Sequence, residues 1–118
     1  MTTVHVEIDL YSGRENPGWD LREADVPHFR TRLAALSPDS FGVPSVPDGL
    51  GYRGLHVTVN CDGATQRLVI SAGIVIIEAA TAADRRSLRD PDRALEKWLL
   101  RTGKEHVGAE LLHYLLGE

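Results

Sequence analysis

The sequence lacks the features that mark several common functional classes. Cys61 is the only cysteine among 118 residues, so no internal disulfide can form and nothing suggests an oxidising compartment. No apolar run approaches the roughly 20 residues that span a bilayer, and residues 1–5 lack the basic and apolar regions of a signal peptide. The formal net charge of −4 argues against a broad surface for nucleic acid or anionic membranes. We therefore expect a cytoplasmic protein that binds neither nucleic acid nor a membrane.

Motifs for metals, nucleotides and covalent catalysis are also missing. His106 and His113 are two helical turns apart, but no acidic residue or Cys/His cluster completes a metal-binding pattern. The three glycines of residues 49–54 precede an expected strand, whereas a phosphate is normally held at a helix N-terminus. Cys61 alternates with two valines, so we expect it to point into the core as a small hydrophobic residue and not to act as a nucleophile. The sequence therefore predicts no metal and no cofactor.

Alternation of apolar and polar residues predicts the strands. Asp62-Gly63 has the composition of a tight hairpin turn, and Ala72-Gly73 has that of a bulge or turn. The residues expected to face the helices are Val4, Val6, Ile8, Leu10, Val57 and Val59. The expected strands cover residues 4–11, 55–61, 66–71 and 74–78, the last either as a separate strand or as a continuation.

Apolar residues at helical spacing predict the helices. A first helix is expected over residues 23–36, and it should begin near residue 25 because Pro27 is tolerated only in the first turn. Asp90-Pro91 resembles an N-cap followed by proline at the first helical position, and Gly103 should end that helix before a last one. The simplest fold is α+β: a small, mostly antiparallel sheet of about three to four strands with helices packed on one face, as one domain over residues 1–118.

The polar face of the first strand is one candidate site. His5, Glu7, Asp9 and Tyr11 share it, with about 7 Å between successive members. A histidine and carboxylates in this arrangement can bind an ammonium group and accept its proton. The alternative is a solvated strand face, which is normally polar.

The loop of residues 12–19 is the second candidate. Arg14 offers five donors in a rigid fork that suits carboxylates or peptide carbonyls. Trp19 offers a flat apolar surface. The alternative is that Trp19 plugs the edge of the core while Arg14 pairs with a nearby carboxylate. Tyr52 and Arg53 repeat the aromatic-plus-arginine combination in a later loop.

The same segments carry a resemblance to known proteins. Residues 9–14, Asn16-Pro17 and residues 19–21 resemble a signature of small bacterial proteins, and residues 50–54 look like their second signature. Glu15 stands where many of those proteins have proline, which makes the loop less stiff and adds a carboxylate. More narrowly, the chain resembles the small enzymes that close the lysinoalanine bridge in cinnamycin- and duramycin-type lanthipeptides.

That resemblance implies a reaction, a partner and a set of site residues. The partner would be a precursor peptide that already carries thioether rings, and the reaction would add a lysine amine to a dehydroalanine. Arg14 or Asn16 would donate hydrogen bonds to the enolate, and Glu7, Asp9, Glu15 or the peptide itself would accept the ammonium proton. Substrate binding would fall to Trp19, Tyr11, Tyr52, Arg53 and His56. The rival interpretations are a non-catalytic peptide-binding or scaffold module that uses an exposed strand edge and a general small-molecule binder.

Two apolar segments also predict a homodimer. Residues 74–77 are apolar on both faces, and the last helix carries four leucines between residues 111 and 116. This is more apolar surface than one short sheet and three helices easily cover. Two-fold pairing would bury it.

Overall fold

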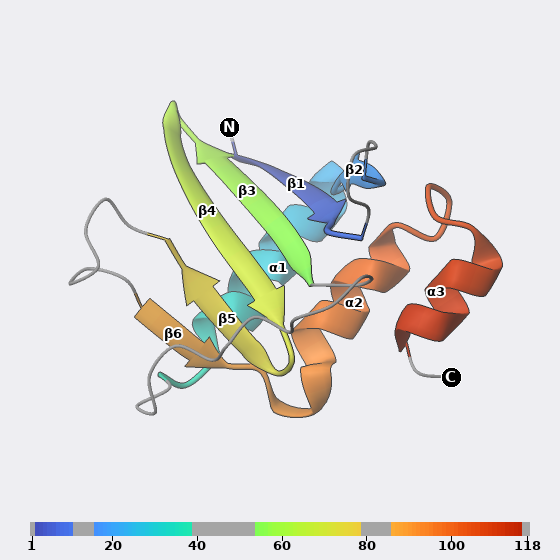
Figure 1. The fold of residues 1–118 in the computed structure, drawn as a ribbon. Helices are drawn as coiled ribbons and strands as arrows, with labels where there is room; N and C mark the ends of the chain where they lie inside the picture. Colours follow the sequence, from blue (N-terminus) through green and yellow to red (C-terminus); the bar gives the residue numbers. More distant parts are fainter. Residues whose placement is uncertain (1, 11–15, 39–53, 79–85, 117–118) are drawn as a thin grey trace.

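The described residues form a six-stranded antiparallel sheet that is covered by helices on one face (Figure 1). The computed structural model describes residues 2–10, 16–38, 54–78 and 86–116. The strand order is β2-β1-β3-β4-β5-β6. The strands are β1 (Thr2–Ile8), β2 (Gly18–Asp20), β3 (Leu55–Cys61), β4 (Ala64–Ser71), β5 (Ile74–Ile77) and β6 (Arg86–Arg89).

The α+β class and the antiparallel pairing match the sequence prediction, but the count of three to four strands was too low. The two strands that were missed, β2 and β6, lie at the edges and have three and four residues. Segments this short contain too little alternation to be recognised without their partners. The first strand also ends at Ile8, three residues earlier than expected, so Asp9 and Leu10 follow the strand.

Three α-helices are present in the described part of the chain: α1 (Val26–Ala34), α2 (Ala94–Thr102) and α3 (Ala109–Leu116). A 3-10 turn over Glu23–Asp25 leads into α1, and Pro27 lies in the first turn of that helix as expected. None of the helices in this part of the chain is long and apolar enough to cross a membrane.

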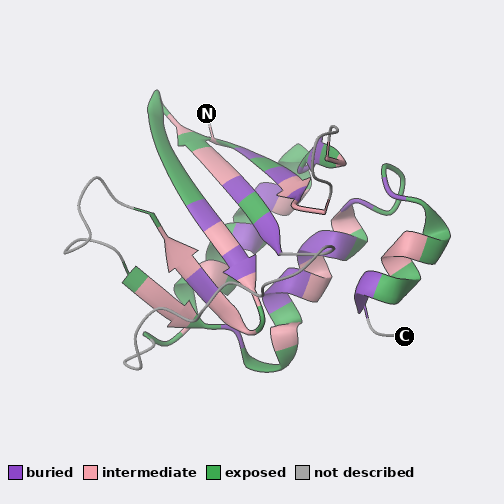
Figure 2. Cartoon of the chain, in the orientation of Figure 1, coloured by how far each residue is buried: buried purple, intermediate pink, exposed green. Residues whose placement is uncertain are grey.

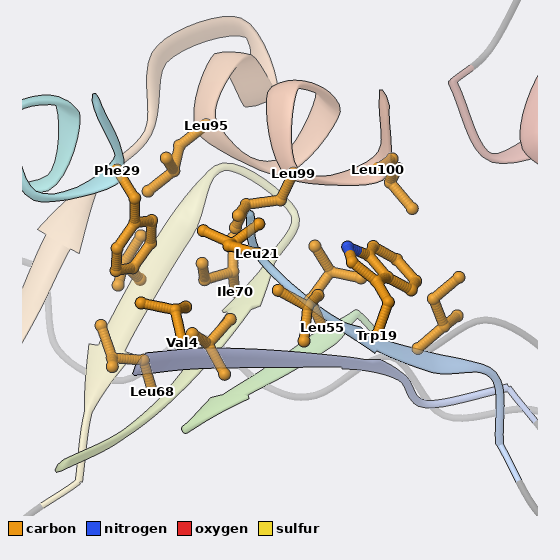
Figure 3. Packing of buried hydrophobic residues seen from close by; sticks show 14 of the residues in the cluster. Val4, Trp19, Leu21, Phe29, Leu55, Leu68, Ile70, Leu95, Leu99 and Leu100 are labelled. Carbon is orange, nitrogen blue, oxygen red and sulfur yellow. The ribbon is translucent and has the colours of Figure 1, made fainter. Parts of the chain in front are cut away.

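The core lies between the helices and one face of the sheet (Figures 2 and 3). In the register, Val6 pairs with Val57 and Val57 pairs with Leu68, so apolar residues of neighbouring strands form continuous rows. Phe29 of α1 and Leu99 of α2 pack onto these rows and are fully buried. The six residues that were predicted to face the helices all belong to this core or pack against it. The opposite face of the sheet carries the polar residues that alternate with these apolar residues along the strands.

A buried carboxylate determines where α2 begins. Pro91 does not start the α-helix as predicted, because Pro91–Arg93 forms a 3-10 turn first. The carboxylate of Asp90 reaches past this turn and accepts hydrogen bonds from the backbone N–H groups of Leu95 (2.8 Å) and Glu96 (3.1 Å). Asp90 is only 1% exposed, so these bonds are its compensation for burial.

Candidate functional site

The described ends of the two signature segments meet at one end of the sheet, where β1 ends and β3 begins. The backbone N–H of Asp9 donates to the carbonyl oxygen of Gly54 at 3.0 Å. One residue earlier, the N–H of Ile8 donates to the carbonyl of Pro17 at 2.9 Å, which holds the far end of the first signature loop against β1. Segments that are more than 40 positions apart in the sequence are therefore joined at this end of the sheet.

Gly54 holds this junction in a conformation that other residues rarely adopt. Its φ of 111° lies in the left-handed region, and a Cβ at this position would lie 2.5 Å from the carbonyl oxygen of Ile70. Any side chain would therefore push β4 away. We did not assign Gly54 a role from the sequence, although it is the last residue of the second signature.

Asp9 and His56 form the central polar pair of the site. The Oδ2 atom of Asp9 lies 3.0 Å from Nε2 of His56, and the two side chains are 28% and 46% exposed. When the imidazole is neutral with its proton on Nε2, that nitrogen donates to Asp9 and Nδ1 can accept a further proton. The pair therefore combines a carboxylate held by a hydrogen bond with an imidazole that has a second nitrogen free to act as an acceptor.

The polar row on β1 does not act as a single cluster. His5 turns toward the other neighbour of β1, and its Nδ1 lies 2.9 Å from Oδ1 of Asp20 on β2. Glu7 is half-buried, and its register partners are Gly18 on one side and His56 on the other. Of the predicted row, Glu7 and Asp9 thus belong with His56 at the junction, whereas His5 belongs to a separate pair.

Trp19 lies in the core, which corrects its assignment as a substrate-binding surface. It is 3% exposed, its Nε1 donates to Oγ1 of Thr102 at 3.0 Å, and its ring is parallel to that of His106 with 6.4 Å between centroids. This is the packing role that the alternative interpretation of the loop predicted. The ring anchors the end of the first signature loop to the region around the end of α2, where Gly103 lies against it.

Asn16 stabilises the base of the loop. Its Oδ1 accepts a hydrogen bond from the backbone N–H of Leu10 at 3.1 Å, so the amide connects the two ends of the segment. Asn16 was one of the two residues predicted to donate to an enolate. In the fold its amide oxygen holds Leu10 in place.

Five of the predicted site residues lie outside the described residues: Tyr11, Arg14, Glu15, Tyr52 and Arg53. Within the described ranges, no group of three or more His, Cys, Asp or Glu residues is arranged to hold a metal ion. Comparisons with protein-family models, with curated proteins and with solved structures found no match.

Proposed function

We propose that this chain is a cytoplasmic, cofactor-independent enzyme of lanthipeptide maturation that closes a lysinoalanine bridge in a ribosomal peptide. The observation that supports this proposal is the junction of the two signature segments beside the Asp9–His56 pair. In the sequence these segments share only a resemblance to known proteins. In the fold the described ends of these segments, at Asp9 and Gly54, are hydrogen-bonded to each other beside the half-exposed acid–imidazole pair, as the parts of one site would be.

The reaction needs proton transfer and positioning, and this site has groups suited to both. The lysine Nζ forms a bond to Cβ of dehydroalanine while the carbon–carbon π bond breaks and its electrons move toward the neighbouring carbonyl. One proton leaves the ammonium group and one arrives at Cα, so the product is an isomer of the substrate. Free lysine has a pKa of about 10.4, so a base must take up the ammonium proton near neutral pH. We assign this role to Asp9 with His56, or to the neighbouring Glu7.

Holding the lysine amine close to the alkene lowers the remaining part of the activation barrier. Well-oriented intramolecular reactions gain up to about 7–11 kcal/mol from proximity. Donors directed at the developing enolate oxygen add to this effect, and we assign that role to Arg14. In this proposal, the modified precursor peptide binds at the junction.

The experiment is incubation with a dehydrated, thioether-cyclised peptide, followed by thiol trapping of the remaining dehydroalanine. Trapping is necessary because bridge closure leaves the mass of the peptide unchanged. Asp9→Asn should lower the rate of closure by about 100-fold, because the pair loses its carboxylate. Asp20→Asn is the matched control, since Asp20 also pairs with a histidine but lies away from the junction, and it should close the bridge at the rate of the unmodified protein. Equal rates for both variants would contradict the placement of the base.

Arg14 provides a second test of the same site. Arg14→Ala should reduce closure severely at an unchanged thermal midpoint, because alanine removes the planar donor fork. Arg14→Lys should restore little activity, since lysine keeps the charge but loses the bidentate geometry. Full activity of Arg14→Ala would remove Arg14 from the site.

The main rival is a non-catalytic peptide-binding module, and the short edge strand β2 favours it. β2 follows the first signature loop directly, and β1 is its only partner strand among the described residues. An extended peptide can add to such an edge through backbone hydrogen bonds. The trapping assay distinguishes the two functions, because a binding module would retain the peptide without protecting its dehydroalanine from the thiol.

A further inference from the structure

A hollow lies at the opposite end of the sheet from the junction. It has a volume of about 670 Å³ and lies between α1 and the inner face of the sheet, beside the turn that joins β3 to β4. β1 alone is about 20 Å long, so this hollow is far from Asp9 and His56. Its volume falls in the range of about 300–1,000 Å³ that is typical of small-molecule sites.

Among the described residues, α1 is the only helix that lines this hollow, and the sheet is wider than this one helix. Six strands span about 24 Å, whereas one helix is about 10–12 Å across. α1 has nine residues and covers only part of the inner face with Phe29 and Leu33. On the inner face of the sheet, the half-buried residues Val59, Ile77 and Leu88 line the hollow and form an apolar floor.

Two arginines give this apolar hollow a positive rim. Arg30 comes from α1, and Arg86 opens β6 opposite Ile77 in the register, so it lies on the same inner face as the floor. Both are exposed, and neither makes an ion pair with another residue of the described part of the chain. Among the described residues that line the hollow there is no carboxylate, although the whole chain has a net charge of −4. Asp20 and Glu23 line a second hollow, which shares Thr2 and Arg30 with the first.

We propose that this hollow binds a small amphipathic carboxylate, with its hydrocarbon chain on the apolar floor and its carboxylate at Arg86 and Arg30. The apolar floor favours the hydrocarbon part of the ligand, because each CH₂ group removed from water contributes about 0.8 kcal/mol to the binding free energy. Guanidinium groups match a carboxylate in charge and in donor geometry. This site is independent of the proposed bridge-closing function, because it shares no residue with the junction.

The test is a titration of the purified chain with decanoate, followed by backbone amide chemical shifts. We expect saturable chemical-shift changes at residues that line the hollow, such as Leu33, Val59 and Cys61, and no changes at Asp9 or His56. 1-Decanol should bind at least about tenfold more weakly, since it lacks the charge. Arg86→Gln should weaken decanoate binding by about tenfold.

Arg89→Gln is the matched control, because Arg89 belongs to the same strand but alternates to the opposite face of the sheet. It should bind decanoate with the affinity of the unmodified chain. The amide spectrum of each variant reports its folding in the same experiment. Absence of saturable shifts at millimolar decanoate, equal binding of 1-decanol, or equal losses in the two variants would each overturn the proposal.

Discussion

At the scale of single residues, Asp90 provides a direct test of how a buried carboxylate supports a helix. Both of its oxygens accept backbone N–H groups at the start of α2. In Asp90→Asn, one of these N–H groups would face an amide NH₂ group and lose its acceptor, so we expect a loss of about 1–3 kcal/mol in the free energy of unfolding. Urea denaturation measures this change.

Asp92→Asn is the control for that variant. Asp92 is exposed, and its φ of 57° is one that asparagine tolerates well. We expect its free energy of unfolding to stay within about 0.5 kcal/mol of the unmodified value. An equal effect of the two substitutions would show that charge, and not the buried hydrogen bonds, accounts for the loss.

Gly103 and Trp19 test the packing of the loop anchor. A Cβ at Gly103 would lie 2.4 Å from the indole ring of Trp19, which is itself held by Thr102. We therefore expect Gly103→Ala to destabilise the chain by about 1–3 kcal/mol. Gly108→Ala is the control, because nothing lies within 4 Å of its Cβ position, and its midpoint of thermal unfolding should not fall. A Gly103→Ala midpoint equal to that of the control would mean that the indole can move at little cost.

At the scale of elements, the β3–β4 turn and the β4–β5 turn have similar backbones but different residues. Asp62-Gly63 and Ala72-Gly73 each place two successive residues at positive φ, as type I′ turns require. Aspartate tolerates the first position, whereas alanine is strained there. The turn between β4 and β5 is therefore the less favourable of the two.

Ala72→Asn should relieve this strain. We expect an increase of about 0.5–1 kcal/mol in the free energy of unfolding, because Asn-Gly is a preferred pair in these turns. Asp62→Asn is the matched substitution in the other turn, and it should change stability little because aspartate already suits that position. A loss of stability in Ala72→Asn, measured by urea denaturation, would contradict this account of the turn.

At the scale of the whole molecule, the expected homodimer concerns apolar residues that the helices do not cover. Ile74 and Ile76 alternate with buried Val75, so they lie on the sheet face opposite the core, and each is half-buried. Tyr114 on α3 is 76% exposed. Ile74 and Ile76 belong to one of the two segments from which the sequence predicted a second copy. In the other segment, Leu115 and Leu116 are buried in the core and Leu111 and Leu112 pack against it, so the leucines behind that prediction are packed within one chain and Tyr114 is the large apolar side chain that α3 exposes.

Light scattering at micromolar concentration should therefore return about 26 kDa, twice the 13.0 kDa mass of the chain. Ile76→Thr keeps a β-branched side chain but removes apolar area, so it should shift the equilibrium toward the monomer if the sheet face pairs. Tyr114→Ser tests the α3 surface in the same way. A mass of 13.0 kDa for the unmodified chain would contradict the homodimer.

The sequence alone determined the elements whose signals are local. Alternation in β1 and β3 identified the buried faces of those strands, Pro27 located the start of α1, and Asp62-Gly63 identified a hairpin. Each of these signals lies within a few residues and rests on the period of side-chain direction or on backbone preference. The α+β class followed from them, as did the polar face on which His56 lies.

Only the tertiary structure decided the features that depend on distant partners. β2 and β6 exist because neighbouring strands pair with them, and three or four residues cannot specify this locally. Trp19 is a core residue because Thr102, 83 positions later, accepts its N–H. Asp9 and His56 are 47 positions apart, and no short-range pattern connects them. The physical reason is that a buried ring or a polar pair depends on which segments the folded sheet and helices bring together, whereas periodicity only reports which way each side chain points.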